Sequence, residues 1–262
     1  EELGIPNNDF YINGVAQKRS FYFGQNISRG NIFKAPANVF VEGEESSLFY
    51  GFQTNGIYQT EDTDLAEGAV AGDVRIIDQN EDGKIDLNDR TFIGNPNPDF
   101  VYGFNISLRI KRITARLLFN GVQGNDIANG NLLQLDNAEG IITNILPNAY
   151  INAWRPEAQS NTHPRIGFTT NGRVAISDRI IEDGSYLRLN NMTVGFDVPI
   201  SESSVIDKMN LYIAGQNLFT LTNYSGYDPE ISNFLYTGLI NGVDWNGPPN
   251  ARTILLGLNV NF

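Results

Sequence analysis

The stretch FVYGFNISLRI, residues 100–110, alternates between two kinds of side chain along its whole length. Its apolar set is Phe100, Tyr102, Phe104, Ile106, Leu108 and Ile110. Small or polar side chains and Val101 occupy the positions between them. Successive side chains of a β-strand point to opposite faces of a sheet, so the pattern predicts a strand with one apolar face. Its length is close to the roughly 9–11 residues that a tilted strand needs to cross a bilayer.

Further stretches of the same kind follow along the chain. Residues 113–124 come directly after the two-residue turn KR and alternate, as do residues 192–198, whereas residues 208–221 alternate less regularly. The last stretch, RTILLGLNVNF, places apolar side chains at every second position and ends the sequence at Phe262. A weaker strand is expected at about residues 10–23, without an assignment of its faces. Together these stretches predict about six antiparallel strands in an all-β fold.

The connections between these strands alternate between long and short. Long loops are expected at about residues 24–98, 125–184 and 222–250, with short turns at 111–112 and 200–207. Outer-membrane β-barrels have short periplasmic turns and long extracellular loops, so the spacing favours a transmembrane barrel. The alternative is a secreted β-sandwich braced by calcium that binds glycans or surfaces, because a sandwich core produces the same side-chain alternation. The lipid face of a barrel lacks charge across its middle, and residues 100–110 and 254–262 fit that requirement.

Composition excludes several classes of function. The chain of 262 residues has a net charge of −12, which argues against nucleic acid as a partner, and it has no cysteine. Its only histidine, His163, cannot form a usual zinc site or a catalytic triad with a second base, so we predict no catalytic residue and no enzyme. The sequence has no initiator Met, no signal peptide and no long apolar run, and we expect a piece of a longer polypeptide.

The stretch DQNEDGKIDLND, residues 78–89, has the spacing of a calcium loop of the EF-hand type. Oxygen ligands are expected at six positions: Asp78, Asn80, Asp82, Lys84 through its backbone carbonyl, Asp86 and Asp89. Gly83 stands at the sharp turn and Ile85 at the apolar anchor position, whereas Asp89 replaces the commoner Glu. A structural Ca²⁺ is therefore predicted, with an Asx-turn-rich loop that binds no metal as the alternative. The flanking stretches are rich in Gly, Val and Pro, so they predict no helices.

Aromatic residues of the predicted long loops are candidates for contact with a substrate or a partner protein. They are Trp154, Tyr224, Tyr227, Tyr236 and Trp245. Aromatic rings stack on sugars and anchor protein interfaces, but they also pack loops together.

Five stretches also resemble a known family, both in their residues and in their order along the chain. They are residues 40–60, 71–108, 120–130, 181–199 and 211–230. The most specific feature pairs the calcium-type loop with IGNPNPDF, residues 93–100, which is followed after one residue by YGF, residues 102–104. Over about residues 40–262 the chain resembles the C-terminal third of a SusC/RagA-type TonB-dependent transporter.

This resemblance implies an outer-membrane nutrient importer of a Gram-negative bacterium. Such proteins have a barrel of about 22 strands with an N-terminal plug. They act with a SusD-like surface lipoprotein and take up glycan or peptide fragments with energy from the TonB system. About six strands would leave two unpaired edges in lipid, where backbone groups find no water. The resemblance thus implies that residues 1–262 complete a barrel together with its remaining strands and plug.

Overall fold

The computed structural model describes residues 10–24, 36–135, 144–166, 176–201, 205–231, 241–245 and 247–262. The chain divides into two compact units. The strand unit comprises Pro98–Asn125, Asp183–Glu230 and Pro248–Phe262. The loop unit comprises Glu1–Asn97, Asp126–Glu182 and Ile231–Gly247.

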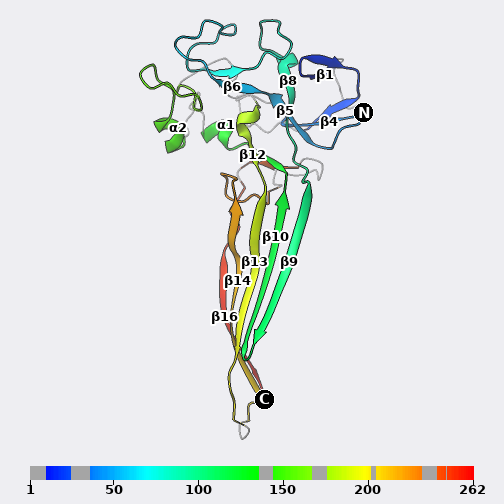
Figure 1. The fold of residues 1–262 in the computed structure, drawn as a ribbon, viewed down its shortest axis with the longest axis vertical. Coiled ribbons are helices and arrows are strands. Elements are labelled where there is room, and N and C mark those ends of the chain that lie inside the picture. Colours follow the sequence, from blue (N-terminus) through cyan, green and yellow to red (C-terminus); the bar gives the residue numbers. More distant parts are fainter. Residues whose placement is uncertain are drawn as a thin grey trace. The chain divides into compact units, whose positions relative to one another are not determined.

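The strand unit is a five-stranded antiparallel sheet in the order β16-β14-β13-β10-β9 (Figure 1). Its strands are β9 (Phe100–Ile110), β10 (Ile113–Gln123), β13 (Tyr186–Asp197), β14 (Lys208–Thr222) and β16 (Thr253–Asn261). The prediction of long antiparallel strands in an all-β fold is therefore confirmed. Only Lys111 and Arg112 separate β9 from β10, whereas residues 124–185 separate β10 from β13. The alternation of short and long connections is confirmed as well.

The register of the sheet aligns the apolar positions of all five strands on one face. One row across the sheet consists of Ile110, Ile113, Phe196, Leu211 and Leu258. These pairings place the predicted apolar side of each strand next to that of its neighbour. Hydrophobic patterning sets register because a slip by one residue would turn a whole strand over.

Strand β13 begins six residues earlier than the alternation of residues 192–198 indicates. Its pairing with β10 shifts between Leu189 and Asn191, which is a β-bulge. On the apolar face, β13 places even-numbered residues from Met192 onward but odd-numbered Leu189 before it. The extra residue of the bulge causes this change, and Leu189 therefore pairs with Phe119 on the same face. Because of this extra residue, strict alternation does not continue into the first half of β13, and the sequence pattern did not predict that half.

Most of the apolar face of the sheet is exposed, although Leu189 near one end of β13 is buried. Leu256 is 72% exposed, Leu258 56% and Ile110 68%. The opposite face is polar, and it carries every charged residue of the five long strands: Arg109, Arg116, Arg188, Asp197 and Lys208. A polar hollow of about 310 Å³ on that face is lined by Thr114, Arg116, Thr193, Gly195, Asn210, Tyr212 and Asn259. One face of the sheet is thus uncharged and apolar, and the other is polar.

The prediction of one long strand over residues 10–23 is wrong. The segment forms three short strands, β1 (Phe10–Ile12), β2 (Val15–Gln17) and β3 (Phe21–Phe23). Asn13 and Gly14 both have positive φ angles, 49° and 72°, which suit the two-residue turn of a tight hairpin. A Cβ atom on Gly14 would lie 2.3 Å from the backbone oxygen of Gln79, so this position requires glycine. The described long strands of the strand unit number five, not six.

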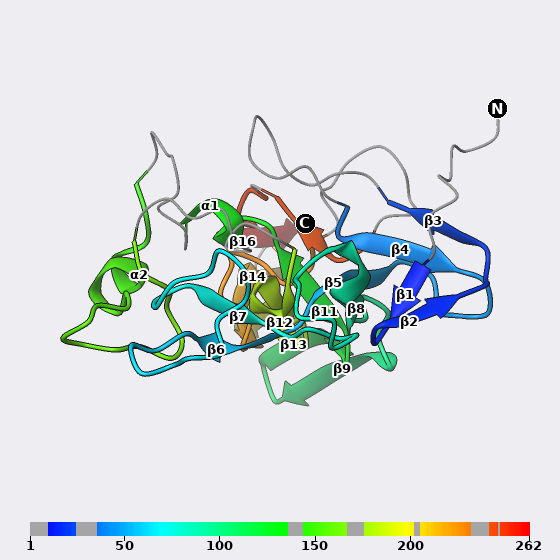
Figure 2. The same ribbon diagram turned by 90° about the horizontal axis from the view of Figure 1, so that it is seen from above.

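The long connections of the chain are folded into short strands and helices. The further strands of the loop unit are β4 (Asn38–Val41), β5 (Leu48–Phe52), β6 (Thr54–Ile57), β7 (Val74–Ile76), β8 (Arg90–Gly94), β11 (Asp126–Asn129), β12 (Ile181–Asp183) and β15 (Val243–Asp244). Its helices are the short α1 (Leu132–Leu135) and α2 (Pro147–Ile151) and the 3₁₀ turns η1 (Leu87–Asp89) and η2 (Asp178–Ile180). The short strands form small sheets in the orders β3-β4-β5-β8, β12-β11-β15, β6-β7 and β1-β2. Figure 2 labels β1 to β8, β11 and β12 among them.

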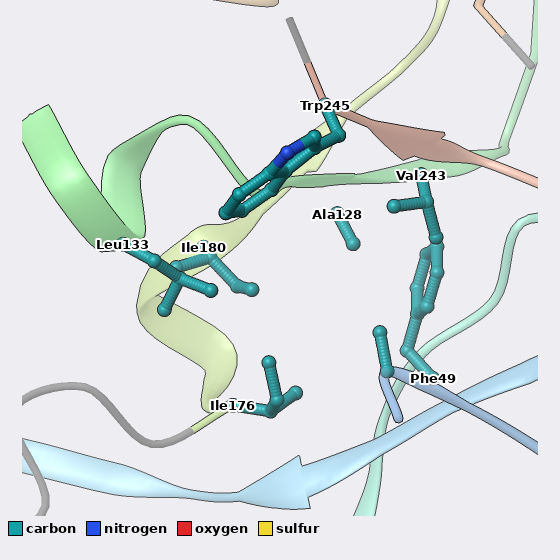
Figure 3. Close-up of a cluster of buried hydrophobic side chains, with 8 residues drawn as sticks. Phe49, Ala128, Leu133, Ile176, Ile180, Val243 and Trp245 are labelled. Atoms are coloured by element: carbon teal, nitrogen blue, oxygen red, sulfur yellow. The ribbon is translucent and has the colours of Figure 1, made fainter. Parts of the chain in front are cut away.

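Three hydrophobic clusters hold these short elements together. The largest brings Phe49, Ala128, Ile176, Val243 and Trp245 into contact, from segments far apart in the sequence (Figure 3). A second cluster is aromatic and centres on Tyr50, whose hydroxyl donates to the backbone oxygen of Tyr11 at 2.7 Å. Burial raises the pKa of Tyr50 to about 12. The third cluster supports the predicted calcium loop and is described below.

Candidate functional site

In the first half of the loop at residues 78–89, aspartate side chains accept hydrogen bonds from backbone amides of the same loop. The Asp78 carboxylate accepts from the amide of Asp82 at 3.3 Å and from that of Gly83 at 2.7 Å. Asp82 in turn accepts from the amide of Lys84 at 2.9 Å. Gly83 has a φ of +82°, and a Cβ atom there would meet no neighbour within 4 Å, so the backbone conformation rather than space calls for glycine. The sharp turn predicted at this position is present.

The second half of the loop is anchored by the buried carboxylate of Asp89. One oxygen accepts from the amide of Gln79 at 2.9 Å, and the other accepts from the amide of Asp86 at 2.7 Å. Asp86 accepts from the amide of Asn88, which completes a capping box for η1. Burial raises the pKa of Asp89, and the two amide hydrogen bonds oppose that rise. Asp89 therefore ties together the two ends of the loop.

The apolar anchor predicted at Ile85 is confirmed. This side chain packs against the third hydrophobic cluster, formed by Phe52, Ile57, Val74, Ile76 and Trp154. The loop is flanked by β7 and β8, and its last three residues form η1, so the expectation of non-helical flanks is confirmed. The loop thus connects two short strands of the loop unit.

The predicted metal ligands all lie among the residues that the structure describes. Within the residues that the structure describes, no three His, Cys, Asp or Glu side chains lie together in an arrangement that could hold a metal ion. The carboxylates of Asp78, Asp82, Asp86 and Asp89 accept from backbone amides instead. Each carboxylate oxygen has a second lone pair, so this donor set is chemically compatible with Ca²⁺. The calcium assignment remains a prediction.

The five loop aromatics have different environments. Trp154, Trp245 and Tyr224 are buried, and each of the two tryptophans belongs to a hydrophobic cluster of the loop unit. The Trp154 indole also donates to Oε1 of Gln59 at 3.1 Å. Tyr227 is 80% exposed. Tyr236 lies outside the described residues. Packing accounts for the buried rings, and Tyr227 is the exposed candidate for contact.

A buried charged cluster on the polar face of the strand unit was missed by the sequence reasoning. Arg188 of β13 is 3% exposed and forms ion pairs with Asp228 and Glu230. Its Nε also donates to the Thr220 hydroxyl at 3.0 Å. The available signal was Arg188 as the only basic residue of its strand, because an arginine that becomes buried requires acidic partners. Nothing in the sequence indicated which of the acidic residues would supply them.

Comparison with known proteins relates the chain to a group of receptors. No family model matches it. The chain is 33% identical over 244 residues to TonB-dependent receptor P3 of Formosa agariphila, covering 89% of this chain and 24% of that protein. It is 26% identical over 264 residues to TonB-dependent receptor SusC of Bacteroides thetaiotaomicron, covering 99% of this chain and 22% of that protein. The chain thus spans about a quarter of the length of the curated relatives it matches.

Solved structures share the fold. The RagAB peptide transporter matches with a TM-score of 0.67 at 20% identity, over 92% of this chain and 24% of the solved chain. The RagAB peptide importer in its closed-closed state matches with a TM-score of 0.65 at 21% identity, over 88% of this chain and 25% of the solved chain. Among the described residues, no helix is long and apolar enough to cross a membrane. The sequence and the fold of this chain fit a segment of a TonB-dependent receptor of the SusC/RagA type.

Proposed function

We propose that this chain is part of the wall and of the outward-facing loops of an outer-membrane nutrient importer in a Gram-negative bacterium. The observation that carries the proposal is the two-sided sheet of the strand unit. Its apolar face is mostly exposed and is uncharged over five strands, and all charges of those strands lie on the other face. An outer-membrane barrel requires this distribution, with lipid outside and water inside.

A soluble sandwich would use the same strands differently. Its apolar face would be buried against a second sheet about 10 Å away. Here the side chains of Leu256, Leu258 and Ile110 are more than half exposed. Exposed apolar patches of this extent mark contact with a membrane or with another protein. Lipid contact is therefore the better explanation of this face.

In this proposal the sheet edges, β9 and β16, pair with the remaining strands of the same receptor. Backbone groups at an open edge would otherwise stay unpaired in lipid. The complete protein would also hold a plug and couple to the TonB system. Its solute would be a glycan or peptide fragment, captured together with a SusD-like lipoprotein. The solved structures named as the RagAB peptide transporter support a peptide as the solute, and the relative named TonB-dependent receptor SusC supports coupling to TonB. No catalytic role is assigned.

The test uses the complete receptor extracted from native outer membranes in detergent. Electrophoresis in SDS with and without boiling is expected to show a heat-dependent shift, because a closed barrel resists SDS until it is heated. Mass spectrometry of co-purifying proteins is expected to detect a SusD-like lipoprotein. Recovery of the protein from the soluble fraction without detergent and without a mobility shift would overturn the proposal in favour of the calcium-braced sandwich.

We further propose that Ca²⁺ braces the loop at residues 78–89. The four aspartates of this stretch, Asp78, Asp82, Asp86 and Asp89, repel each other, and a cation among them would relieve that repulsion. The turn at Gly83 and the anchor at Ile85 are in the positions that a calcium loop requires. Extracellular modules of this kind bind calcium with dissociation constants of about 10⁻⁴–10⁻³ M. The ion would stiffen a loop whose other support is the cluster around Trp154.

Removing one proposed ligand is expected to abolish calcium-dependent stiffening of this loop. Hydrogen exchange of residues 77–89 is measured in the solubilised receptor with and without about 5 mM Ca²⁺, above the expected dissociation constant. In the wild-type receptor the ion slows exchange, and in Asp82→Ala it does not. The matched control is Glu81→Ala, an exposed acidic neighbour whose position in the loop pattern points away from the ion. Equal exchange with and without calcium in the wild type would refute the calcium assignment.

A further inference from the structure

The segment Asn223–Glu230 follows β14 and returns to the polar face of the sheet. Arg188 identifies the face, because it lies in register with Asn120 and Thr220 on the side opposite to Leu189 and Phe119. Asp228 and Glu230 both reach Arg188 from this segment. We call residues 223–230 the strap. The strap therefore lies over the face that a barrel would turn toward its interior.

The contacts of Arg188 use each nitrogen of its guanidinium group. Nη2 donates to the carboxylate of Asp228, Nη1 donates to Oε2 of Glu230 at 2.8 Å, and Nε donates to the Thr220 hydroxyl at 3.0 Å. The Cζ atom lies 5.3 Å from the ring centre of Tyr186. A planar guanidinium with several fixed donors holds carboxylates in one orientation, which the single ammonium of lysine cannot do.

Asp228 is the centre of a second set of contacts that fixes the strap. Its Oδ1 accepts from the amide of Glu230 at 2.9 Å, and its Oδ2 accepts from the side chain of Asn250, which precedes β16, at 2.5 Å. Asp228 is 7% exposed. The strap is thus attached both to β13 through Arg188 and to the chain entering β16 through Asn250.

The two tyrosines of the strap differ sharply in exposure. Tyr224 is 5% exposed and its amide donates to the Thr222 hydroxyl at 3.1 Å, whereas Tyr227 is 80% exposed. Tyr224 therefore anchors the strap, and the ring of Tyr227 is available to a solute. The side chain of Glu230 is 54% exposed, although it is paired with Arg188.

We propose that Arg188 is a positioning residue that clamps the strap over the polar face, where the strap narrows the solute path and presents Tyr227 to the solute. This inference rests on the proposed importer function, because only a barrel makes the polar face the wall of a path. The physical basis is charge balance: Arg188 is the cation between the two carboxylates. Without it, a buried Asp228 and a neighbouring Glu230 remain as like charges, and moving the strap into water relieves both the desolvation and the repulsion.

The clamp is tested by hydrogen exchange on the complete receptor in detergent. In Arg188→Met, exchange of residues 223–230 is expected to rise by about tenfold or more, because loss of a buried pair lowers the local opening energy. Exchange of β10 and of residues 192–197 is expected to stay unchanged, which shows that the sheet remains folded. Arg188→Lys keeps the charge and is expected to restore part of the protection. The matched control is Arg109→Met, since Arg109 is paired with Asp197 on the same face but is 70% exposed.

A second measurement separates the clamp from the importer function. Single-channel conductance of the receptor in planar bilayers is expected to show longer or more frequent openings for Arg188→Met than for Arg109→Met. Unchanged strap exchange in Arg188→Met overturns the clamp whatever the conductance shows. Faster strap exchange with unchanged conductance overturns the constriction. Failure of the receptor to insert into bilayers at all, with strap exchange still dependent on Arg188, counts against the importer and removes the path on which this inference rests.

Discussion

The substitution Leu256→Arg is expected to prevent the receptor from accumulating in the outer membrane, whereas Leu255→Arg is expected to be tolerated. The two leucines are neighbours on β16 and are both exposed, by 72% and 51%. Leu256 pairs with Ile213 on the apolar face, and Leu255 pairs with Ala214 on the polar face. The two variants thus introduce the same side chain at adjacent positions that face opposite environments.

The expected difference follows from the depth of Leu256 along its strand. It lies near the middle of β16, so its side chain would be near the middle of the lipid layer. An arginine there costs about 2–4 kcal/mol, while substitutions that face the interior of a barrel have little effect on stability. The measurement is the amount of heat-shifted, folded receptor in outer-membrane fractions of cells producing each variant. Equal amounts of folded protein for the two variants would contradict the lipid-facing assignment.

The substitution Phe49→Ala is expected to destabilise the loop unit by about 3–5 kcal/mol. Phe49 is fully buried at the centre of the largest hydrophobic cluster, where it contacts residues from distant parts of the chain (Figure 3). Its removal leaves a cavity that these segments fill only in part. Hydrogen exchange of β5 and β11 in the solubilised receptor is expected to accelerate accordingly. Exchange in β9 and β10 is expected to stay at the wild-type level, since their hydrogen bonds are within the strand unit.

Phe40→Ala is the matched control in the same sheet. Phe40 is half-buried on β4, and its ring centre lies 6.0 Å from that of Tyr22. We expect a loss of about 1 kcal/mol or less, as is usual away from a core. Similar acceleration in the Phe40 and Phe49 variants would mean that the cluster around Phe49 does not hold the loop unit together.

The sequence predicted the faces of the long strands because β-structure has a simple period. Apolar positions such as Leu108, Leu117 and Leu256 were assigned to one side from their spacing alone, and the sheet places them there. The same reasoning failed at residues 10–23, where the Asn13–Gly14 turn divides the segment. It also missed the first half of β13, because a bulge interrupts the alternation.

The calcium-type loop was recognised because its predicted ligands and its turn all lie within one short stretch of the chain. The turn at Gly83 and the anchor at Ile85 follow from local spacing, and the structure contains both. The sequence did not reveal a structural role of Asp89 within the loop itself. Its carboxylate binds the amides of Gln79 and Asp86, a contact that only the closed conformation of the loop reveals.

What the sequence by itself determined was periodic or local: an all-β fold, long strands with one apolar face, short and long connections, and a loop with cation-binding spacing. Only the tertiary structure decided which distant residues meet. It buried Trp154, Trp245 and Tyr224, left Tyr227 exposed, and paired Arg188 with Asp228 across 40 positions of sequence. The physical reason is that secondary structure follows from the period of neighbouring side chains, whereas burial and ion pairing depend on how separate segments pack in space.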